Sequence, residues 1–231
     1  MASGISNTFS LEYWENLWNT RKTPWQCEEV RNDVVKYYDQ MTDKGELKRI
    51  LVPLCGKTLE MKFLYERGHE VVGIDLSYKA CKEFFQDNKI KFSEKVDEKS
   101  GAEHLLISED LKIKLYQGEL FKISKDHIGI FDAILDWNSF IAIDPMEREA
   151  YVELQTCLLK PTGRMLLNTF EYPRDEFSGP PCAISISEVE QFYMGKMKVE
   201  FLETISEGLE SKKAHFKVSK ISILIFLLTK L

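Results

Sequence analysis

The segment from Arg49 to Asp75 constrains the fold of this chain more than any other. It predicts a buried strand at Ile50–Leu54, a tight turn, a helix over residues 58–67 and a second buried strand over residues 71–76. Continuous apolar runs are typical of strands that are buried on both faces of a parallel sheet. A strand–turn–helix–strand unit of this kind therefore predicts an α/β fold.

Asp75 lies where a nucleotide-binding unit of this kind places the acid that accepts hydrogen bonds from ribose hydroxyls, roughly 20 residues after the turn. The turn holds a single glycine, Gly56, and lacks the G-x-G-x-x-G pattern that lets backbone approach a pyrophosphate. The pattern thus favours a nucleoside ligand without phosphates, such as S-adenosylmethionine. The alternative is a helix packed on a parallel sheet without any ligand.

Composition narrows the classes of partner. A chain of 231 residues is long enough for one well-packed domain, and we expect a single domain over residues 1–231. The net charge of −6, without a long run of one sign, argues against nucleic acid as a partner. The five cysteines have neither metal-ligand spacing nor the pattern of a disulfide framework, so we expect no metal site and a reducing, cytoplasmic location.

The two ends of the sequence give no sign of a membrane. The first seven residues lack the basic and apolar regions of a secretory signal. The apolar tail at Ile221–Leu228 is shorter than the ~20 residues that a spanning helix needs, and it predicts a buried strand. No coiled-coil pattern or exposed apolar stripe is evident, and this favours a monomer.

Strands and helices alternate along most of the chain. Residues 91–109 are polar and predict an inserted loop or hairpin. Because no helix fits the polar linker between the last two strands, these strands are expected to pair antiparallel. The predicted strands cover residues 50–54, 71–76, 111–115, 131–135, 164–170, 198–205 and 220–228. The fold class is therefore α/β, with a seven-stranded, mostly parallel Rossmann-like sheet, an antiparallel terminal hairpin and helices on both faces, as in class I methyltransferases.

Several segments carry a resemblance to a known family. They are Leu11-Glu-Tyr-Trp-Glu-Asn-Leu-Trp18, Pro53-Leu-Cys-Gly-Lys57, Arg67-Gly-His-Glu-Val-Val-Gly-Ile-Asp75, the stretch from Phe131 to Asp144, and Gly179-Pro-Pro181. On these segments, in this order and at this spacing, the chain resembles the thiopurine S-methyltransferase family. The resemblance implies S-adenosylmethionine as the methyl donor and a small-molecule methyl acceptor.

The resemblance also implies roles for individual residues. Residues 1–45 form a helical lid or cover, in which Trp14 and Trp18 close over the cofactor and Trp25 faces the substrate. Without the family, aromatic residues at this helical spacing would be assigned to the core. The implied cofactor contacts also include Leu54 and Gly56 at the methionine part, Asp75 at the ribose, Glu119 and Leu120 around adenine, and Trp137. For Glu119 the alternative is a solvated carboxylate in a turn.

The acceptor side departs from the family. Drug-metabolising members have an arginine and a glycine where this chain has Trp137 and Asn138, and we expect Asn138 to contact the substrate. Near the end of the chain, Lys212, Lys213 or His215 takes the place of a second family arginine. Asp136 either orients the cofactor, receives a proton or caps the loop that follows it.

The predicted activity is S-adenosylmethionine-dependent methyl transfer to the sulfur of a small aromatic or heterocyclic thiol. A thiol with a low pKa is already ionised near neutral pH, so no catalytic base is assigned. One alternative is the same fold and cofactor with a nitrogen, oxygen, sulfide or selenide acceptor. Another is a non-catalytic domain that binds the nucleoside.

Overall fold

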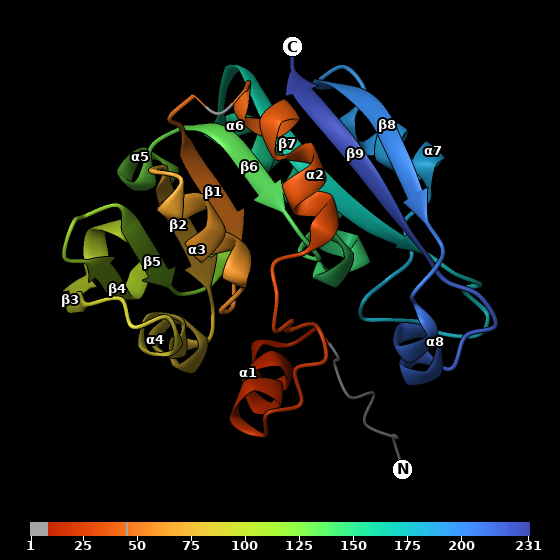
Figure 1. Cartoon of the computed structure of the whole chain (residues 1–231), viewed down its shortest axis with the longest axis horizontal. Coiled ribbons are helices and arrows are strands. Elements are labelled where there is room, and N and C mark those ends of the chain that lie inside the picture. Colours follow the sequence, from red (N-terminus) through yellow and green to blue (C-terminus); the bar gives the residue numbers. More distant parts are fainter. Residues whose placement is uncertain (1–8, 45) are drawn as a thin grey trace.

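A single twisted sheet runs through the computed structural model, which describes residues 9–44 and 46–231 (Figure 1). Within these residues the sheet has nine strands, in the order β3-β4-β5-β2-β1-β6-β7-β9-β8. The five central strands, from β5 to β7, are parallel, and antiparallel strands flank them on both sides. This confirms the mostly parallel α/β sheet with an antiparallel terminal hairpin.

The strands are β1 (Arg49–Pro53), β2 (Glu70–Asp75), β3 (Phe92–Asp97), β4 (Ala102–Ser108), β5 (Ile113–Gln117), β6 (Phe131–Asp136), β7 (Leu159–Glu171), β8 (Met197–Ile205) and β9 (Ser222–Lys230). The α-helices are α1 (Leu11–Asn19), α2 (Asn32–Thr42), α3 (Leu59–Glu66), α4 (Tyr78–Asp87), α5 (Lys125–Ile128), α6 (Arg148–Leu158), α7 (Ile186–Tyr193) and α8 (Glu210–Phe216). Short 3₁₀ helices also occur among the described residues, at Glu98–Ser100, Leu120–Lys122, Phe140–Ala142 and Pro145–Glu147.

The two strands beyond the predicted seven are the β3–β4 hairpin. It occupies the segment that was expected to form a loop or hairpin, and β4 pairs with β5. The hairpin lies at the edge of the sheet, and its outer strand β3 is exposed along its middle residues. A strand that buries little apolar surface shows little hydrophobic alternation, so the sequence pattern did not separate it from a loop.

The terminal strands β8 and β9 pair antiparallel, as predicted. The expectation that no helix fits between them is wrong, because α8 lies in that linker. This helix sits beyond the end of β8 and does not cross a face of the sheet (Figure 1). The chain therefore turns back beside β8 without a crossover, and the pairing stays antiparallel.

Serine hydroxyls cap two of the helices that cover the sheet. Ser77 caps α4 by accepting a hydrogen bond from the backbone N–H of Ala80 at 3.2 Å. The cap of α7 is Ser185. Ser185 and Glu188 form a capping box, in which each side chain satisfies a backbone N–H of the other residue.

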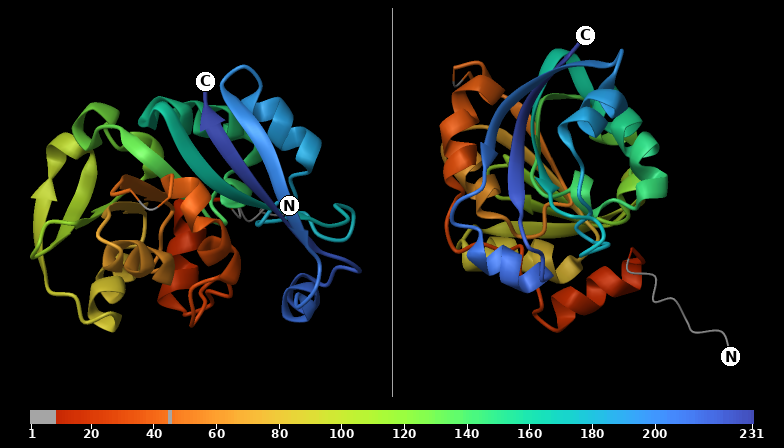
Figure 2. Two further views of the ribbon diagram at one scale, coloured as in Figure 1. Left: turned by 45° about the horizontal axis from the view of Figure 1, so that its top comes forward. Right: turned by 90° about the vertical axis from the view of Figure 1, so that its right-hand side faces the viewer.

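Helices cover both faces of the sheet. Helices α2 and α3 lie on one face, and α6 and α7 on the other (Figure 2). Helices α1 and α8 lie off the carboxyl ends of the parallel strands (Figure 1). Ligands of open α/β sheets bind at this edge. None of the helices in the described ranges is both long and apolar enough to cross a bilayer.

Candidate functional site

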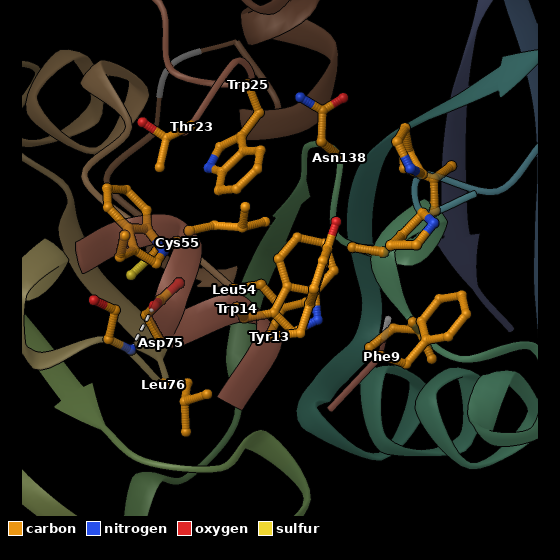
Figure 3. Close-up of a pocket in the computed structure, with 18 of the residues that line it drawn as sticks. Phe9, Tyr13, Trp14, Thr23, Trp25, Leu54, Cys55, Asp75, Leu76 and Asn138 are labelled. Atoms are coloured by element: carbon orange, nitrogen blue, oxygen red, sulfur yellow. Dashed lines mark hydrogen bonds between the residues drawn. The ribbon is translucent and has the colours of Figure 1, made fainter. Parts of the chain in front are cut away.

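A cavity of about 1150 Å³ opens at the carboxyl edge of the parallel strands (Figure 3). Its wall comes from α1 and the segment after it, the turn after β1, the end of β2, the loops after β5 and β6, and α8. Of the ten residues predicted to bind cofactor or substrate, nine line this cavity: Trp14, Trp18, Trp25, Leu54, Asp75, Glu119, Leu120, Trp137 and Asn138. The structure thus brings together residues that are far apart in the sequence.

Asp75 ends β2 beside the turn that follows β1. Its Oδ2 accepts a hydrogen bond from the backbone N–H of Gly56 at 2.7 Å, and its Oδ1 accepts one from the N–H of Ser77 at 2.8 Å. Burial raises the pKa of Asp75 to about 6, and the two backbone hydrogen bonds oppose this shift. Each carboxylate oxygen keeps a second lone pair, so the group can still accept hydrogen bonds from a ligand.

The turn between β1 and α3 has a left-handed backbone at two positions, Leu54 with φ of 44° and Gly56 with φ of 50°. Gly56 is the predicted cofactor residue that does not line the cavity. A Cβ at this position would lie 2.8 Å from the ring of Trp18. Glycine is therefore required here because the amino-terminal segment packs directly on the turn.

Three tryptophans form the wall that α1 and its following loop contribute. The ring of Trp25 meets the rings of Trp14 and Trp18 edge to face, at centroid distances of 5.6 and 6.0 Å. Lys79 of α4 donates a hydrogen bond to the backbone carbonyl of Trp18 at 3.2 Å. The aromatic cluster is thereby tied to the half of the sheet that holds Asp75.

Glu119 and Leu120 follow β5 at the same end of the cavity as Asp75. Leu120 is buried, and Glu119 pairs with Lys122 at 2.5 Å. The N–H of Gly118 donates to the carbonyl of Asp75 at 2.9 Å, which fixes this loop beside β2. A buried leucine beside a buried carboxylate suits a nucleoside, whose base is apolar on its faces and whose ribose is polar.

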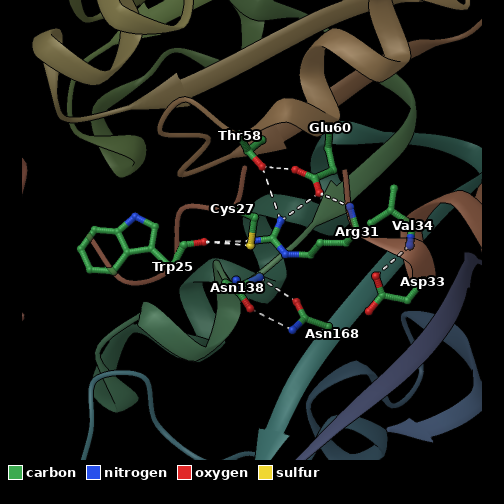
Figure 4. A network of polar contacts seen from close by, with 9 residues as sticks. All are labelled: Trp25, Cys27, Arg31, Asp33, Val34, Thr58, Glu60, Asn138 and Asn168. Carbon is green, nitrogen blue, oxygen red and sulfur yellow. Dashed lines mark hydrogen bonds and ion pairs between the residues drawn. The ribbon is translucent and has the colours of Figure 1, made fainter. Parts of the chain in front are cut away.

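The opposite end of the cavity is built around Trp137 and Asn138, after β6. Asn138 has a φ of 65°, a conformation that asparagine tolerates well. Its backbone N–H and its side-chain oxygen both bind the amide of Asn168, at 2.7 and 2.9 Å (Figure 4). This pairing uses the oxygen of the Asn138 amide and leaves its NH₂ group as a donor.

Arg31 brings a guanidinium to this end of the cavity, 5.9 Å from the centre of the Trp137 ring. It forms an ion pair with Glu60 at 3.0 Å and donates to the carbonyl of Trp25 at 3.0 Å (Figure 4). Arg31 thus connects the tryptophan wall to the start of α3. It was not predicted, because a single arginine before a helix carries no sequence signal for a site.

The three basic residues of α8 differ in whether they reach the cavity. Lys212 and His215 of α8 line the cavity, whereas Lys213 does not. The ammonium of Lys212 lies 5.9 Å from the centre of the Phe170 ring, which also lines the cavity. Burial lowers the pKa of Lys212 from its usual value.

Asp136 does not line the cavity. It is fully buried, and it accepts hydrogen bonds from the backbone N–H of Phe140 at 3.0 Å, the hydroxyl of Tyr151 at 2.8 Å and the amide of Gln155. Burial raises its pKa to about 6. Of the three roles considered for Asp136, this geometry supports capping of the loop that carries Trp137 and Asn138.

Other residues of the wall were missed. They include Tyr13, Thr23, Leu76, Ile141, Phe170 and Phe216. Most are apolar residues whose sequence pattern is that of any core residue, so only the fold separates them from the core. Pro180 and Pro181 had a signal, since they belong to a segment that carried the family resemblance, but no role had been assigned to them.

The sequence matches the family model described as thiopurine S-methyltransferase over residues 9–230. It is 33% identical to a thiopurine S-methyltransferase of Nitrosospira multiformis, and the match covers 94% of this chain and 96% of that protein. It is 32% identical to the thiopurine S-methyltransferase of Bos taurus, with 89% of this chain and 84% of the bovine protein covered.

Solved structures support the fold. A Burkholderia thailandensis 1,6-didemethyltoxoflavin-N1-methyltransferase, crystallised with S-adenosylhomocysteine, superposes with a TM-score of 0.65. The match covers 96% of this chain and 88% of that one, at 13% identity. TehB from Haemophilus influenzae superposes with a TM-score of 0.61 at 16% identity, covering 95% of this chain and 66% of that one. These likenesses confirm the class I methyltransferase fold, with nine strands where seven were predicted.

Proposed function

Because this chain belongs to the thiopurine S-methyltransferase family, we propose that it methylates the sulfur of a small aromatic or heterocyclic thiol. The chain is an S-adenosylmethionine-dependent methyltransferase with a small-molecule acceptor. The observation that supports the proposal is that one cavity extends from the buried carboxylate of Asp75 to the aromatic ring of Trp137 and the guanidinium of Arg31. The family match favours sulfur over nitrogen, oxygen, sulfide or selenide as the acceptor atom.

The residues of the Asp75 end fit S-adenosylmethionine. Asp75 would accept hydrogen bonds from the ribose hydroxyls, and Glu119 and Leu120 would lie around the adenine. Leu54 would contact the methionine part, while Trp14, Trp18 and Trp137 would cover the donor. Gly56 would act indirectly, because it gives Trp18 its close approach to the turn.

When bound, S-adenosylmethionine supplies a methyl group on a positively charged sulfur, which makes the group reactive towards nucleophiles. The acceptor thiolate forms the new sulfur–carbon bond, and the electron pair of the broken bond neutralises the sulfonium. The thiol proton has already left to solvent, so this chain needs no catalytic base. Its own residues hold the acceptor in line with the methyl group and exclude water, and alignment of this kind supplies much of the rate of such reactions.

The remaining expectations also belong to this proposal. Residues 1–45 would act as a lid over the site and the chain as a single domain. Residues 1–8 and 45 of that lid lie outside the described residues. Trp25 and Asn138 would face the acceptor. We further propose a cytoplasmic monomer that binds neither nucleic acid nor membrane, in keeping with the net charge of −6 and with five unpaired cysteines in the described ranges.

Calorimetric titration with S-adenosylhomocysteine tests the donor site, with NAD as the control ligand. We expect micromolar binding of S-adenosylhomocysteine and none of NAD. The Asp75→Ala variant should lose that binding. A screen of aromatic thiols with S-adenosylmethionine then tests the acceptor. If S-adenosylhomocysteine binds but no thiol is methylated, the proposed acceptor class is wrong.

A further inference from the structure

Three side chains at the acceptor end of the cavity have N–H groups that are available to a ligand. Lys212, Arg31 and Asn138 all reach this wall. The oxygen of the Asn138 amide is bound to Asn168, so its free atom is a donor. An arginine and a lysine offer donors only. A ligand group that fits between them must therefore accept hydrogen bonds.

Among these donors, Lys212 gives the clearest indication of the charge of the ligand. Within residues 9–44 and 46–231, its ammonium has no hydrogen-bond partner and no carboxylate within ion-pair distance, although the residue is half-buried. The charged side chains that act on it are Arg31 and Asp33. The Asp33 carboxylate accepts a hydrogen bond from the backbone N–H of Val34 at 2.9 Å and does not line the cavity. A cation that gives up part of its hydration without gaining an ion-pair partner is destabilised unless a ligand supplies the opposite charge.

The guanidinium of Arg31 cannot neutralise the ammonium of Lys212, and it adds to the positive potential at this end of the cavity. Its carboxylate partner Glu60 belongs to the first turn of α3 and is 1% exposed. Glu60 also accepts hydrogen bonds from the backbone N–H of Arg31 and from the hydroxyl of Thr58, so its negative charge is already shared among three donors. The Arg31 guanidinium has five N–H donors, and the contacts to Glu60, Thr58 and Trp25 use three of them.

We propose that the acceptor carries a carboxylate besides its thiol, and that Lys212, Arg31 and Asn138 bind this carboxylate at the end of the cavity opposite Asp75. The inference rests on the proposed function and names its substrate class. A carboxylate suits the site because it accepts several charge-assisted hydrogen bonds at once. The aromatic residues Trp137 and Phe170 between these donors suit an aromatic ring as the body of the acceptor.

Two acceptors of similar shape test the proposal. They are 4-mercaptobenzoate and 4-methylthiophenol, and the second has a methyl group where the first has a carboxylate. We expect kcat/KM to favour 4-mercaptobenzoate by at least about tenfold, as one or more charge-assisted hydrogen bonds would give. Lys212→Met should reduce that preference about tenfold through KM, and Lys212→Arg should restore most of it. Lys213→Met, on the same helix but outside the cavity wall, is the matched control and should leave the preference unchanged.

A binding measurement keeps the two proposals separate. Benzoate is titrated into the complex with S-adenosylhomocysteine, and the affinity of each variant for S-adenosylhomocysteine confirms that it is folded. We expect Lys212→Met to weaken benzoate binding about tenfold. If benzoate does not bind, or binds Lys212→Met as tightly as the unchanged protein, the carboxylate site is wrong. Thiol methylation without any carboxylate preference would overturn this inference and leave the proposed function intact.

Discussion

At the scale of single residues, the buried carboxyl of Asp75 makes the stability of the fold depend on pH. Its pKa is raised to about 6 by burial, from a usual value of 3.8. The folded chain therefore keeps this proton to a higher pH than the unfolded chain does. The contribution of this group to the free energy of unfolding is largest below its usual pKa, and it is lost as pH rises through 6.

Cofactor binding should depend on pH in the opposite sense. In the proposed site, ribose hydroxyls would donate to the ionised carboxylate, so affinity for S-adenosylhomocysteine should rise as pH rises through about 6 and fall about tenfold at pH 5. Calorimetry at several pH values measures this. Asp75→Asn should bind weakly and with a flat profile. Asp136→Asn is the control for the second buried acid, and a profile that persists in Asp75→Asn would refute the assignment.

Trp137 stands where the drug-metabolising relatives are expected to carry an arginine. Trp137→Arg should lower the free energy of unfolding by about 2 to 4 kcal/mol, because the position is 8% exposed and the Arg31 cation already lies 5.9 Å from the ring. Urea unfolding measures the loss, and Trp137→Phe is the control that keeps an aromatic ring. A variant as stable as Trp137→Phe would show that the site accommodates a second guanidinium.

Single residues could be predicted from the sequence where the fold requires one type of side chain at a defined position. Asp75 was found because an acid at the end of a second buried strand has a defined place in the fold. Gly56 was found as part of the turn, yet its reason, the close approach of Trp18, depends on a contact between distant segments. Arg31 and Lys212 were not predicted to lie together, because only the folded chain brings the residue before α2 and the helix α8 to one wall.

At the scale of elements, the Arg31–Glu60 ion pair joins the tryptophan wall to α3. Arg31→Met would leave the carboxylate of Glu60 buried without its cation and should cost about 3 kcal/mol of stability. The double variant Arg31→Met, Glu60→Met should recover part of this loss. Thermal unfolding of Arg31→Met, of Glu60→Met and of the double variant measures the coupling. Additive losses would mean that the pair does not stabilise this junction.

The start of α7 offers a matched pair of serines. Ser185→Ala removes the capping box and should lower the free energy of unfolding by about 1 kcal/mol. Ser187→Ala, within the first turn, should change it by less than half as much. Chemical denaturation resolves the difference. Equal effects would show that the hydroxyl of Ser185 is not what holds the helix start.

Element prediction depended on how strongly each segment is patterned. The strands β1 and β2 are apolar along their length and were located to within a residue or two. The strand β3 and the short helix α8 are polar and mostly exposed, so the sequence marked them only as irregular segments.

At the scale of the molecule, β9 is central to one half of the sheet, since it pairs with both β7 and β8. Phe226→Ala should cost about 3 to 5 kcal/mol, because this ring is fully buried in β9. Phe201, its partner on β8, is 42% exposed, so Phe201→Ala should cost far less. Urea unfolding compares them. Similar losses would mean that the edge strand is as important to the core as β9.

The overall arrangement of the parallel strands followed from the sequence, because alternating buried strands and helices allow few topologies. The spatial order of the last three strands did not, since residues that pair in β7 and β9 are separated by the whole of α7, β8 and α8. Antiparallel pairing was predictable. The insertion of β9 between β7 and β8 required the structure.

That insertion affects how the chain is made. A ribosome releases β7 and then β8 before β9, although β9 separates them in the finished sheet. Until β9 emerges, the nascent chain presents two unpaired edges that can bind each other or a neighbouring chain. The part of the sheet formed by β7, β8 and β9 is therefore completed last, after every strand of the half that holds Asp75 has been synthesised.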